Sequence, residues 1–272
     1  MRVPLTFLAA SLLLANAGHA SATDTRIPDA TVKAAEQLRD KALTDDTGYK
    51  IVTSLTTEVG PRIAGGVNDA RGRAWAIAKF KELGYDKVYT EAVTYPLWQR
   101  RSEHGAIVAP FPQPLALTAL GFSSGTPQGG LTAEVVKFDS LDALKASDPA
   151  SVKGKIVYIG FRMTRQKDGH DYGMGSAIRT GGPAIASSKG AAAFILRSAG
   201  TDANSRTPHT GVTMFKDPAQ AIPAAALSNP DADQLERVLG YGKPVNVKLD
   251  LDCGIVAARR IERAFAAGRR AI

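Results

Sequence analysis

The stretch from Val152 to Ser198 constrains the fold more than any other part of the sequence. Residues 156–161 (IVYIGF) form a short, continuous run of β-branched and aromatic residues that follows a Gly-Lys turn. Such a run is too short for a helix and predicts a strand buried on both faces. Residues 183–189 are compatible with a helix, and Ala191–Leu196 predicts a second buried strand. A Gly- and His-bearing loop, 167–179, is expected before the helix. The result is a strand–helix–strand unit with its own core, which the flanking segments complete.

The N-terminus has the composition of a secretory signal. Met1-Arg2 precedes an apolar run, Leu5–Leu14, and small residues follow up to Ala22. This order predicts export by a signal peptide spanning residues 1–22, cleaved after Ala20 or Ala22, and hence a secreted or periplasmic protein. The apolar run is too short for a stable membrane anchor, and nothing later in the sequence has the pattern of a membrane span.

The net charge of +8 is concentrated at the C-terminus and does not indicate nucleic-acid binding. The tail at 256–272 holds five arginines against one acid, Glu262. Since no basic patch with interleaved aromatic residues occurs in the rest of the chain, we expect no nucleic-acid partner. The single cysteine, Cys253, excludes an internal disulfide, which is compatible with the bacterial periplasm.

The first hundred residues predict helices that lead into a strand. Apolar residues recur at helical spacing in Asp29–Thr44, and a second helix is expected over Gly48–Val59, before a Gly-Pro pair. A third is expected from Asn68, an N-cap residue type, to Gly84. Val, Tyr and Thr are enriched in Lys87–Tyr95, which predicts a strand.

After Trp98 the residue pattern changes, and short strand-like segments alternate with Pro- and Gly-rich connectors. These pieces are 105–108, 117–122 and 131–138 ahead of the strand–helix–strand unit, and the apolar run 221–228 after it. A helix is expected from Pro230 to Gly240, with acidic residues in its first turn. In Val245–Leu251 apolar and polar residues alternate, which predicts a strand with one buried face.

The predicted fold class is therefore α/β (α+β), a helical N-terminal piece followed by a strand-rich module. The predicted division is a signal peptide at 1–22, a helical segment at 23–97, the strand-rich module at 98–252 and a tail at 253–272. The tail consists almost entirely of Ala, Arg, Gly and a few apolar residues. It fits either a basic amphipathic helix that binds a membrane or partner, or an out-of-frame translation without function.

Seven segments of the chain resemble one known family and occur in that family's order. Together they cover roughly residues 45–250 and resemble the N-terminal portion of carboxypeptidase Q-type enzymes, which are secreted di-zinc peptidases with an inserted protease-associated (PA) domain. The segments are EVGPRIAGG (58–66), LGFSSGTP (120–127), VKGKIVYIG (152–160), GSAIR (175–179), KGAAAFILRS (189–198), PHTG (208–211) and IPAAALSNPDADQL (222–235).

The resemblance implies the chemistry of the full-length family and sets a limit for this chain. In the family, two bridged zinc ions and a general-base Glu hydrolyse dipeptides or short peptides. The zinc ligands of the family begin after the PA insertion, with a His-x-Asp motif and an Asp-Asp-Gly turn that have no counterpart here. The resemblance therefore implies a truncated exopeptidase whose catalytic sheet is largely missing. We assign this chain no catalytic residue, no metal ligand and no zinc of its own, and expect it to be inactive. Peptide would be the substrate of the intact enzyme, and its dimerisation stays open.

The remaining candidate residues give one possible contact and several exclusions. His104, His170 and His209 are far apart and lack a second ligand at metal-binding spacing, so each is expected in a loop or at a strand edge. The resemblance implies that His209, in PHTG, lies on the PA face above the catalytic cleft and contacts substrate; the alternative is a turn residue. Cys253 lacks a placed base, and the Gly-rich stretches lack the Gly-Lys-Ser/Thr ending of a phosphate loop. A PA-domain module that binds peptides or proteins without catalysis is the second function that the sequence allows.

Overall fold

The computed structural model describes residues 26–268, and the chain divides into two compact units between Thr57 and Glu58. The described part of the first unit consists of α1 (Asp29–Thr44) and α2 (Thr47–Ser54), both of which lack buried residues. The predicted second helix changes to a π-helical turn, η1 (Leu55–Val59), before it ends. The predicted signal peptide, residues 1–22, lies outside the described residues. Among the described helices none is both long and apolar enough to cross a membrane.

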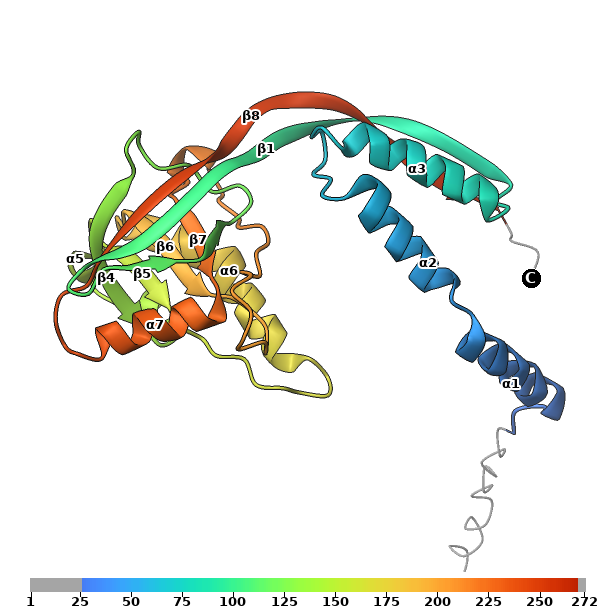
Figure 1. The fold of residues 1–272 in the computed structure, drawn as a ribbon, viewed down its shortest axis with the longest axis horizontal. Coiled ribbons are helices and arrows are strands. Elements are labelled where there is room, and N and C mark those ends of the chain that lie inside the picture. Colours follow the sequence, from blue (N-terminus) through green and yellow to red (C-terminus); the bar gives the residue numbers. More distant parts are fainter. Residues whose placement is uncertain (1–25, 269–272) are drawn as a thin grey trace, which may run out of the picture. The chain divides into compact units, whose positions relative to one another are not determined.

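Two long antiparallel strands dominate the second unit. β1 (Lys87–Ala109) pairs with β8 (Asn246–Ala267) over its whole length, from Lys87 opposite Ala267 to Ala109 opposite Asn246. We call the half of this pair that begins at Lys87 and Ala267 the ribbon. Helix α3 (Asp69–Glu82) lies along the ribbon, as Figure 1 shows, and the guanidinium of Arg73 donates to the Glu262 carbonyl at 3.2 Å. Register shifts at Leu97/Trp98 and Arg100/Ser102 mark where the ribbon joins the rest of the sheet.

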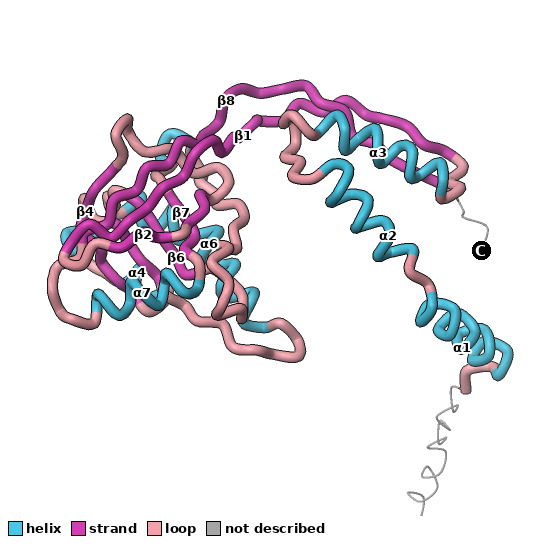
Figure 2. Tube along the Cα trace, viewed as in Figure 1, coloured by secondary structure: helices cyan, strands magenta, loops and turns pink. Residues whose placement is uncertain are grey.

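The other half of β1 and β8 belongs to a curled eight-stranded sheet of order β2-β1-β8-β4-β5-β6-β7-β3. Strands β4, β5, β6 and β7 are parallel to one another, and the remaining pairs are antiparallel. β2 and β3 end the order on opposite sides, yet only Ala116 separates them in sequence, so the sheet is nearly closed (Figure 2). The six shorter strands are β2 (Gln113–Leu115), β3 (Leu117–Ala119), β4 (Leu131–Phe138), β5 (Ile156–Ile159), β6 (Ala193–Arg197) and β7 (Ala224–Leu227).

Several helices of this unit have a side-chain hydrogen bond that caps their N-terminus. Ser140 caps α4, and Ser228 caps α7 by accepting from the Asp231 amide. These oxygens satisfy amide groups that have no partner within the helix itself. Residue Gly240 follows the end of α7, as the sequence predicts. The helices are α4 (Leu141–Ala146), α5 (Pro149–Val152), α6 (His170–Ser188), the 3₁₀ turn η2 (Pro218–Gln220) and α7 (Asn229–Leu239).

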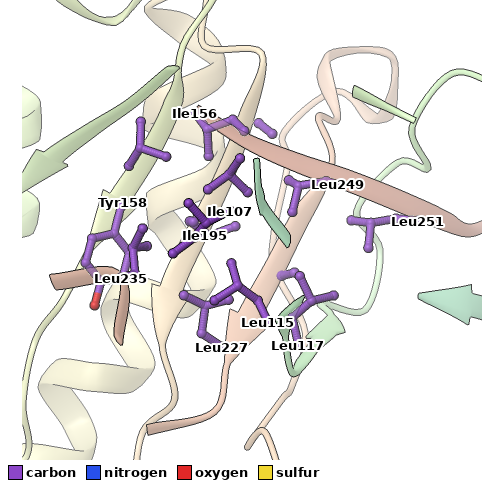
Figure 3. Close-up of a cluster of buried hydrophobic side chains, with 14 of the residues drawn as sticks. Ile107, Leu115, Leu117, Ile156, Tyr158, Ile195, Leu227, Leu235, Leu249 and Leu251 are labelled. Atoms are coloured by element: carbon purple, nitrogen blue, oxygen red, sulfur yellow. The ribbon is translucent and has the colours of Figure 1, made fainter. Parts of the chain in front are cut away.

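The core lies on both faces of the parallel strands. Ile156 and Tyr158 of β5 belong to the cluster on the concave side together with Leu249 and Leu251 of β8, as Figure 3 shows. Val157 and its neighbours on the other face pack against α4 and α6. All four residues of β5 and all five of β6 are buried, which confirms the prediction of strands buried on both faces. The predicted alternation in Val245–Leu251 is confirmed as well, since the four apolar residues are buried.

Two predictions of secondary structure are wrong. The predicted loop before Pro183 is helical from His170 onward, because the missing side chain at Gly182 lets α6 pack directly on the Phe194 ring of β6. The helical reading of the tail is wrong through Ala267, because those residues pair with β1 in β8. As a result β1 and β8 run across the predicted boundaries at 97/98 and 252/253 without a break.

Candidate functional site

One face of α6 presents an aromatic, a hydroxyl and a guanidinium group in line. Tyr172, Ser176 and Arg179 are four and three residues apart, a spacing that places side chains on the same side of a helix. Arg179 Nη2 donates to Ser176 Oγ at 3.1 Å, and its Cζ lies 5.9 Å from the centroid of the Tyr172 ring. The guanidinium therefore lies at the outer limit of the cation–π range from the ring.

His209 reaches this face of α6 from the loop that follows β6. Ser198, the residue after β6, is 3% exposed and holds the loop: it accepts from the His209 amide at 2.8 Å and donates to the Leu227 carbonyl at 2.6 Å. Two residues on, the Gly211 carbonyl accepts from the Gly121 amide at 2.8 Å. The loop around His209 is thus fixed to the ends of strands β6 and β7.

The His209 ring meets the α6 face at the protein surface. Its Nε2 lies 3.1 Å from the Tyr172 hydroxyl, and the two ring centroids are 5.7 Å apart at an interplanar angle of 71°. Partial burial and then the nearby charge of Arg179 lower the pKa of His209 below its usual value of 6.5. A ring with that pKa is neutral at pH 7, so one ring nitrogen accepts and the other donates.

Arg179 is a buried cation without a carboxylate partner among the described residues. The residue is 9% exposed, and its Nε and Nη1 have no hydrogen-bond partner. The backbone of Gly211 packs on the guanidinium so closely that a Cβ there would lie 2.6 Å from Nε. We refer to Tyr172, Ser176, Arg179 and His209 as the Arg179 cluster.

The second buried arginine of this unit, Arg197, has two carboxylate partners, although its Nε has no hydrogen-bond partner among the described residues. Arg197, at the end of β6, donates to Asp233 and also, at 3.2 Å, to Glu236 of α7. The Glu236 carboxylate accepts from the Tyr158 hydroxyl at 2.9 Å, and burial followed by this carboxylate raises the pKa of Tyr158. Arg162 pairs with Asp233 from the surface. This network joins β5, β6 and α7 at the carboxyl ends of the parallel strands.

A small cavity of about 80 Å³ adjoins that network. It is lined by Arg162, Arg197 and Asn229, together with the residues from Gly200 to Ala203. Asn229 Nδ2 donates to the Asp202 carbonyl at 2.7 Å, which ties this loop to the start of α7. The cavity has room for a few water molecules.

The other histidines do not assemble a site. His104 is exposed on β1. His170 is the exposed first residue of α6, so the expectation that it lies in a loop or at a strand edge is wrong. Asp171 instead accepts from the Thr164 amide at 2.8 Å. Within residues 26–268, no group of three or more His, Cys, Asp or Glu side chains is placed to hold a metal ion. The described part of the chain therefore does not fit a zinc centre.

Cys253 is a core residue rather than a reactive thiol. It is buried on β8, its sulfur lies 3.6 Å from the Ser124 carbonyl, and burial raises the pKa of the thiol. A protonated, inaccessible thiol is a poor nucleophile, as the sequence indicates.

Known proteins similar to this chain are peptidases. The family profile of the PA domain matches residues 131–235. Human carboxypeptidase Q is 30% identical over 208 residues, which are 75% of this chain and 41% of the human protein. The crystal structure of a peptidase M28 precursor from Shewanella amazonensis superimposes with a TM-score of 0.81 at 44% identity, and the match covers 88% of this chain and 54% of that one.

A more distant structure shares the fold alone. A zinc aminopeptidase from Bacillus subtilis matches 79% of this chain and 45% of its own at 19% identity, with a TM-score of 0.51. The chain thus spans about half the length of the relatives it matches.

The fold and these relatives relate the chain to the M28 peptidase family, and residues 131–235 to the PA domain. Within that class it belongs with the carboxypeptidase Q-like metallopeptidases, as the sequence resemblance implies.

Proposed function

We propose that the intact protein is a zinc-dependent exopeptidase that hydrolyses dipeptides or short peptides, and that this chain supplies its N-terminal segment and PA domain. The similarity to the Shewanella M28 peptidase over 88% of the chain carries the proposal. Zinc enters through the family, since the Bacillus neighbour is a zinc aminopeptidase.

We further propose that the 272-residue chain by itself does not turn over peptides. The support is the sequence: its histidines after the leader lack partners at ligand spacing, and no His-x-Asp or Asp-Asp-Gly motif occurs. The test is hydrolysis of a dipeptide panel by the purified chain with added zinc. Dipeptide hydrolysis that a chelator abolishes would refute the proposal that the chain is inactive. Hydrolysis that is the same with heat-denatured chain would come from the assay background and not from the protein.

His209 is the residue that we propose to contact the peptide. It is exposed, its loop is held by Ser198, and its ring carries one donor and one acceptor nitrogen beside Tyr172. Dipeptides are expected to shift the His209 ring resonances in an NMR titration, while those of His104 on β1 stay unchanged. Equal or absent shifts at both rings would remove His209 from the proposed site.

A non-catalytic binding role is the second candidate. The support for this role is that the strand-rich unit has a core on both faces of its sheet and that residues 131–235 match the PA domain. A concentration-dependent capture of one specific partner by the chain, without turnover, would favour this role.

Export by the N-terminal leader completes the proposal. Mass spectrometry of the chain from a bacterial periplasmic extract is expected to give a mature N-terminus at Ser21 or Thr23, after cleavage at Ala20 or Ala22. Recovery of the chain with an intact residue 1–22 segment in the cytoplasmic fraction would contradict it.

A further inference from the structure

The loop that carries His209 is long, and side-chain contacts have to fix its course. All of residues 199–211 are described, and none of them belongs to a helix or strand. Ordering such a loop costs backbone entropy, which specific contacts must offset. Ser198 holds the end of the loop through the His209 amide, and Asn229 holds its start through the Asp202 carbonyl. The middle of the loop needs a further anchor.

Arg206 supplies that anchor by pairing with Asp231 in the first turn of α7. Its Nε donates to Asp231 Oδ2 at 3.0 Å, and its Nη2 donates to Oδ1 at 2.5 Å. A carboxylate bound through two nitrogens of one guanidinium fixes both the distance and the orientation of the pair. Because Arg206 lies three residues before His209, this contact limits where the His209 backbone can lie.

The two partners of this pair differ in how the fold holds them. Asp231 is 4% exposed, and its carboxylate also accepts from the hydroxyl of Ser228, the N-cap residue of α7. The positive end of the helix dipole favours a carboxylate at this place. The Arg206 side chain, in contrast, is 56% exposed. Asp231 is therefore a fixed point of the fold, and the loop is what the pair orders.

We propose that Arg206 and Asp231 position His209 for its contact with the peptide. The pair holds the loop so that the His209 ring stays in the Arg179 cluster, with its Nε2 3.1 Å from the Tyr172 hydroxyl. Neither residue of the pair needs to touch the peptide, since both act through the loop. The inference rests on the proposed peptide contact of His209 and names the residues that keep this contact in place.

Two substitutions that change the local charge in opposite directions provide the test. Arg206→Gln removes a positive charge and Asp231→Asn a negative one, so through charge alone the first would raise the pKa of His209 and the second would lower it. Release of the loop instead takes the ring away from the burial and the Arg179 charge that lower this pKa. We therefore expect both variants to raise the pKa of His209 towards 6.5, measured by NMR of the full chain with isotope-labelled histidine.

The same samples report on peptide binding. Glycylglycine is expected to shift the His209 ring resonances of the wild type saturably, and its dissociation constant should rise at least about tenfold in both variants. Arg206→Lys keeps the charge but not the two-nitrogen geometry, so it should resemble Arg206→Gln. If Asp231→Asn does not fold, Arg206→Lys decides, because a pure charge effect would leave it like the wild type. Arg101→Gln breaks a surface pair with Asp252 and is expected to change neither the pKa of His209 nor binding.

The outcomes separate this inference from the proposed function. If the wild type binds glycylglycine at His209, a pKa that changes in neither variant, or in opposite directions, would overturn the positioning role and leave the peptide contact in place. A rise of the pKa in both variants without weaker binding would overturn it as well, since the position of the ring would not serve the peptide. No response of His209 to glycylglycine in the wild type would overturn the peptide contact itself, and a pKa raised in both variants would then show that the pair positions the ring alone.

Discussion

Two adjacent glycines in α6 provide a sharp test of how this helix packs on the sheet. At Gly181 an added Cβ meets no atom within 4 Å, whereas at Gly182 it would lie 2.6 Å from Cζ and 2.9 Å from Cε2 of Phe194. Phe194 is fully buried on β6, so its ring has no free space to move into. Gly181→Ala is therefore expected to stabilise the protein and Gly182→Ala to destabilise it relative to that change.

The magnitudes follow from the two positions. Alanine gains about 0.5–1 kcal/mol over glycine inside a helix, and this gain is common to both variants. Overpacking a core adds a cost of about 1–3 kcal/mol at Gly182 alone. Because Gly182 precedes Pro183, a Cβ there also meets the proline ring, which acts in the same direction. The two variants should differ in unfolding free energy by about 1–3 kcal/mol, or roughly 2–12 °C in Tm.

Urea unfolding of the full chain, followed by circular dichroism and by the fluorescence of buried Trp98, measures both variants under the same conditions. Phe194→Leu serves as the matched background, because a smaller side chain should reduce the cost of Gly182→Ala. Equal stability of the Gly181→Ala and Gly182→Ala proteins would refute the packing described for α6, and an unchanged cost in the Phe194→Leu background would show that Phe194 is not its cause.

Three further outcomes are expected. Burial acts to raise the pKa of Asp233, but hydrogen bonds from Arg197 and a second arginine outweigh burial and leave that pKa lowered. The contribution of Asp233 to stability is therefore present above about pH 4 and is lost as pH falls through the lowered pKa. Below about pH 4, the urea midpoint of Asp233→Asn should fall less steeply than that of the wild type. The thiol of Cys253 should react with a thiol reagent at least about tenfold more slowly in the folded chain than in urea, and equal rates would contradict its burial. Deletion of residues 254–272 should abolish hydrogen-exchange protection in Lys87–Leu97, since β8 is the strand that pairs with this segment; retained protection would show another partner.

The sequence predicts those elements whose signal is local. The continuous apolar runs of β5 and β6 and the alternation in Val245–Leu251 report burial directly, and Pro230 and Gly240 delimit α7 with ordinary terminal signals. These elements need no knowledge of what lies opposite them in the fold.

Elements fixed by distant contacts are the ones that sequence reasoning missed. The glycines between His170 and Pro183 argue against a helix, yet Gly182 allows the close approach of α6 to Phe194 of the sheet. The Ala- and Arg-rich tail has few residues of high strand propensity, and its pairing with β1 depends on residues more than 150 positions away. Local propensity is overridden by tertiary pairing in both cases.

The candidate site shows the same division. The sequence names His209, in the PHTG segment, as a candidate substrate contact, and the structure places this residue at the surface beside α6. The sequence does not single out Arg179 and Tyr172, because the glycines around them predict a loop and only a helix brings the two side chains to one face. Their spacing of seven residues is two helical turns, which indicates a shared face only when residues 170–188 form a helix.

The continuity of β1 and β8 has a structural consequence. The bulges at Leu97/Trp98 and Arg100/Ser102 increase local twist, and the Trp98 indole N–H, which donates to the Ser123 carbonyl at 2.8 Å, holds the strand at that point. β1 and β8 stay paired on both sides of these bulges, so the same two strands belong to the ribbon beside α3 and to the sheet interior. Loss of the Trp98 indole would therefore remove a tertiary hydrogen bond at the junction of the ribbon and the sheet.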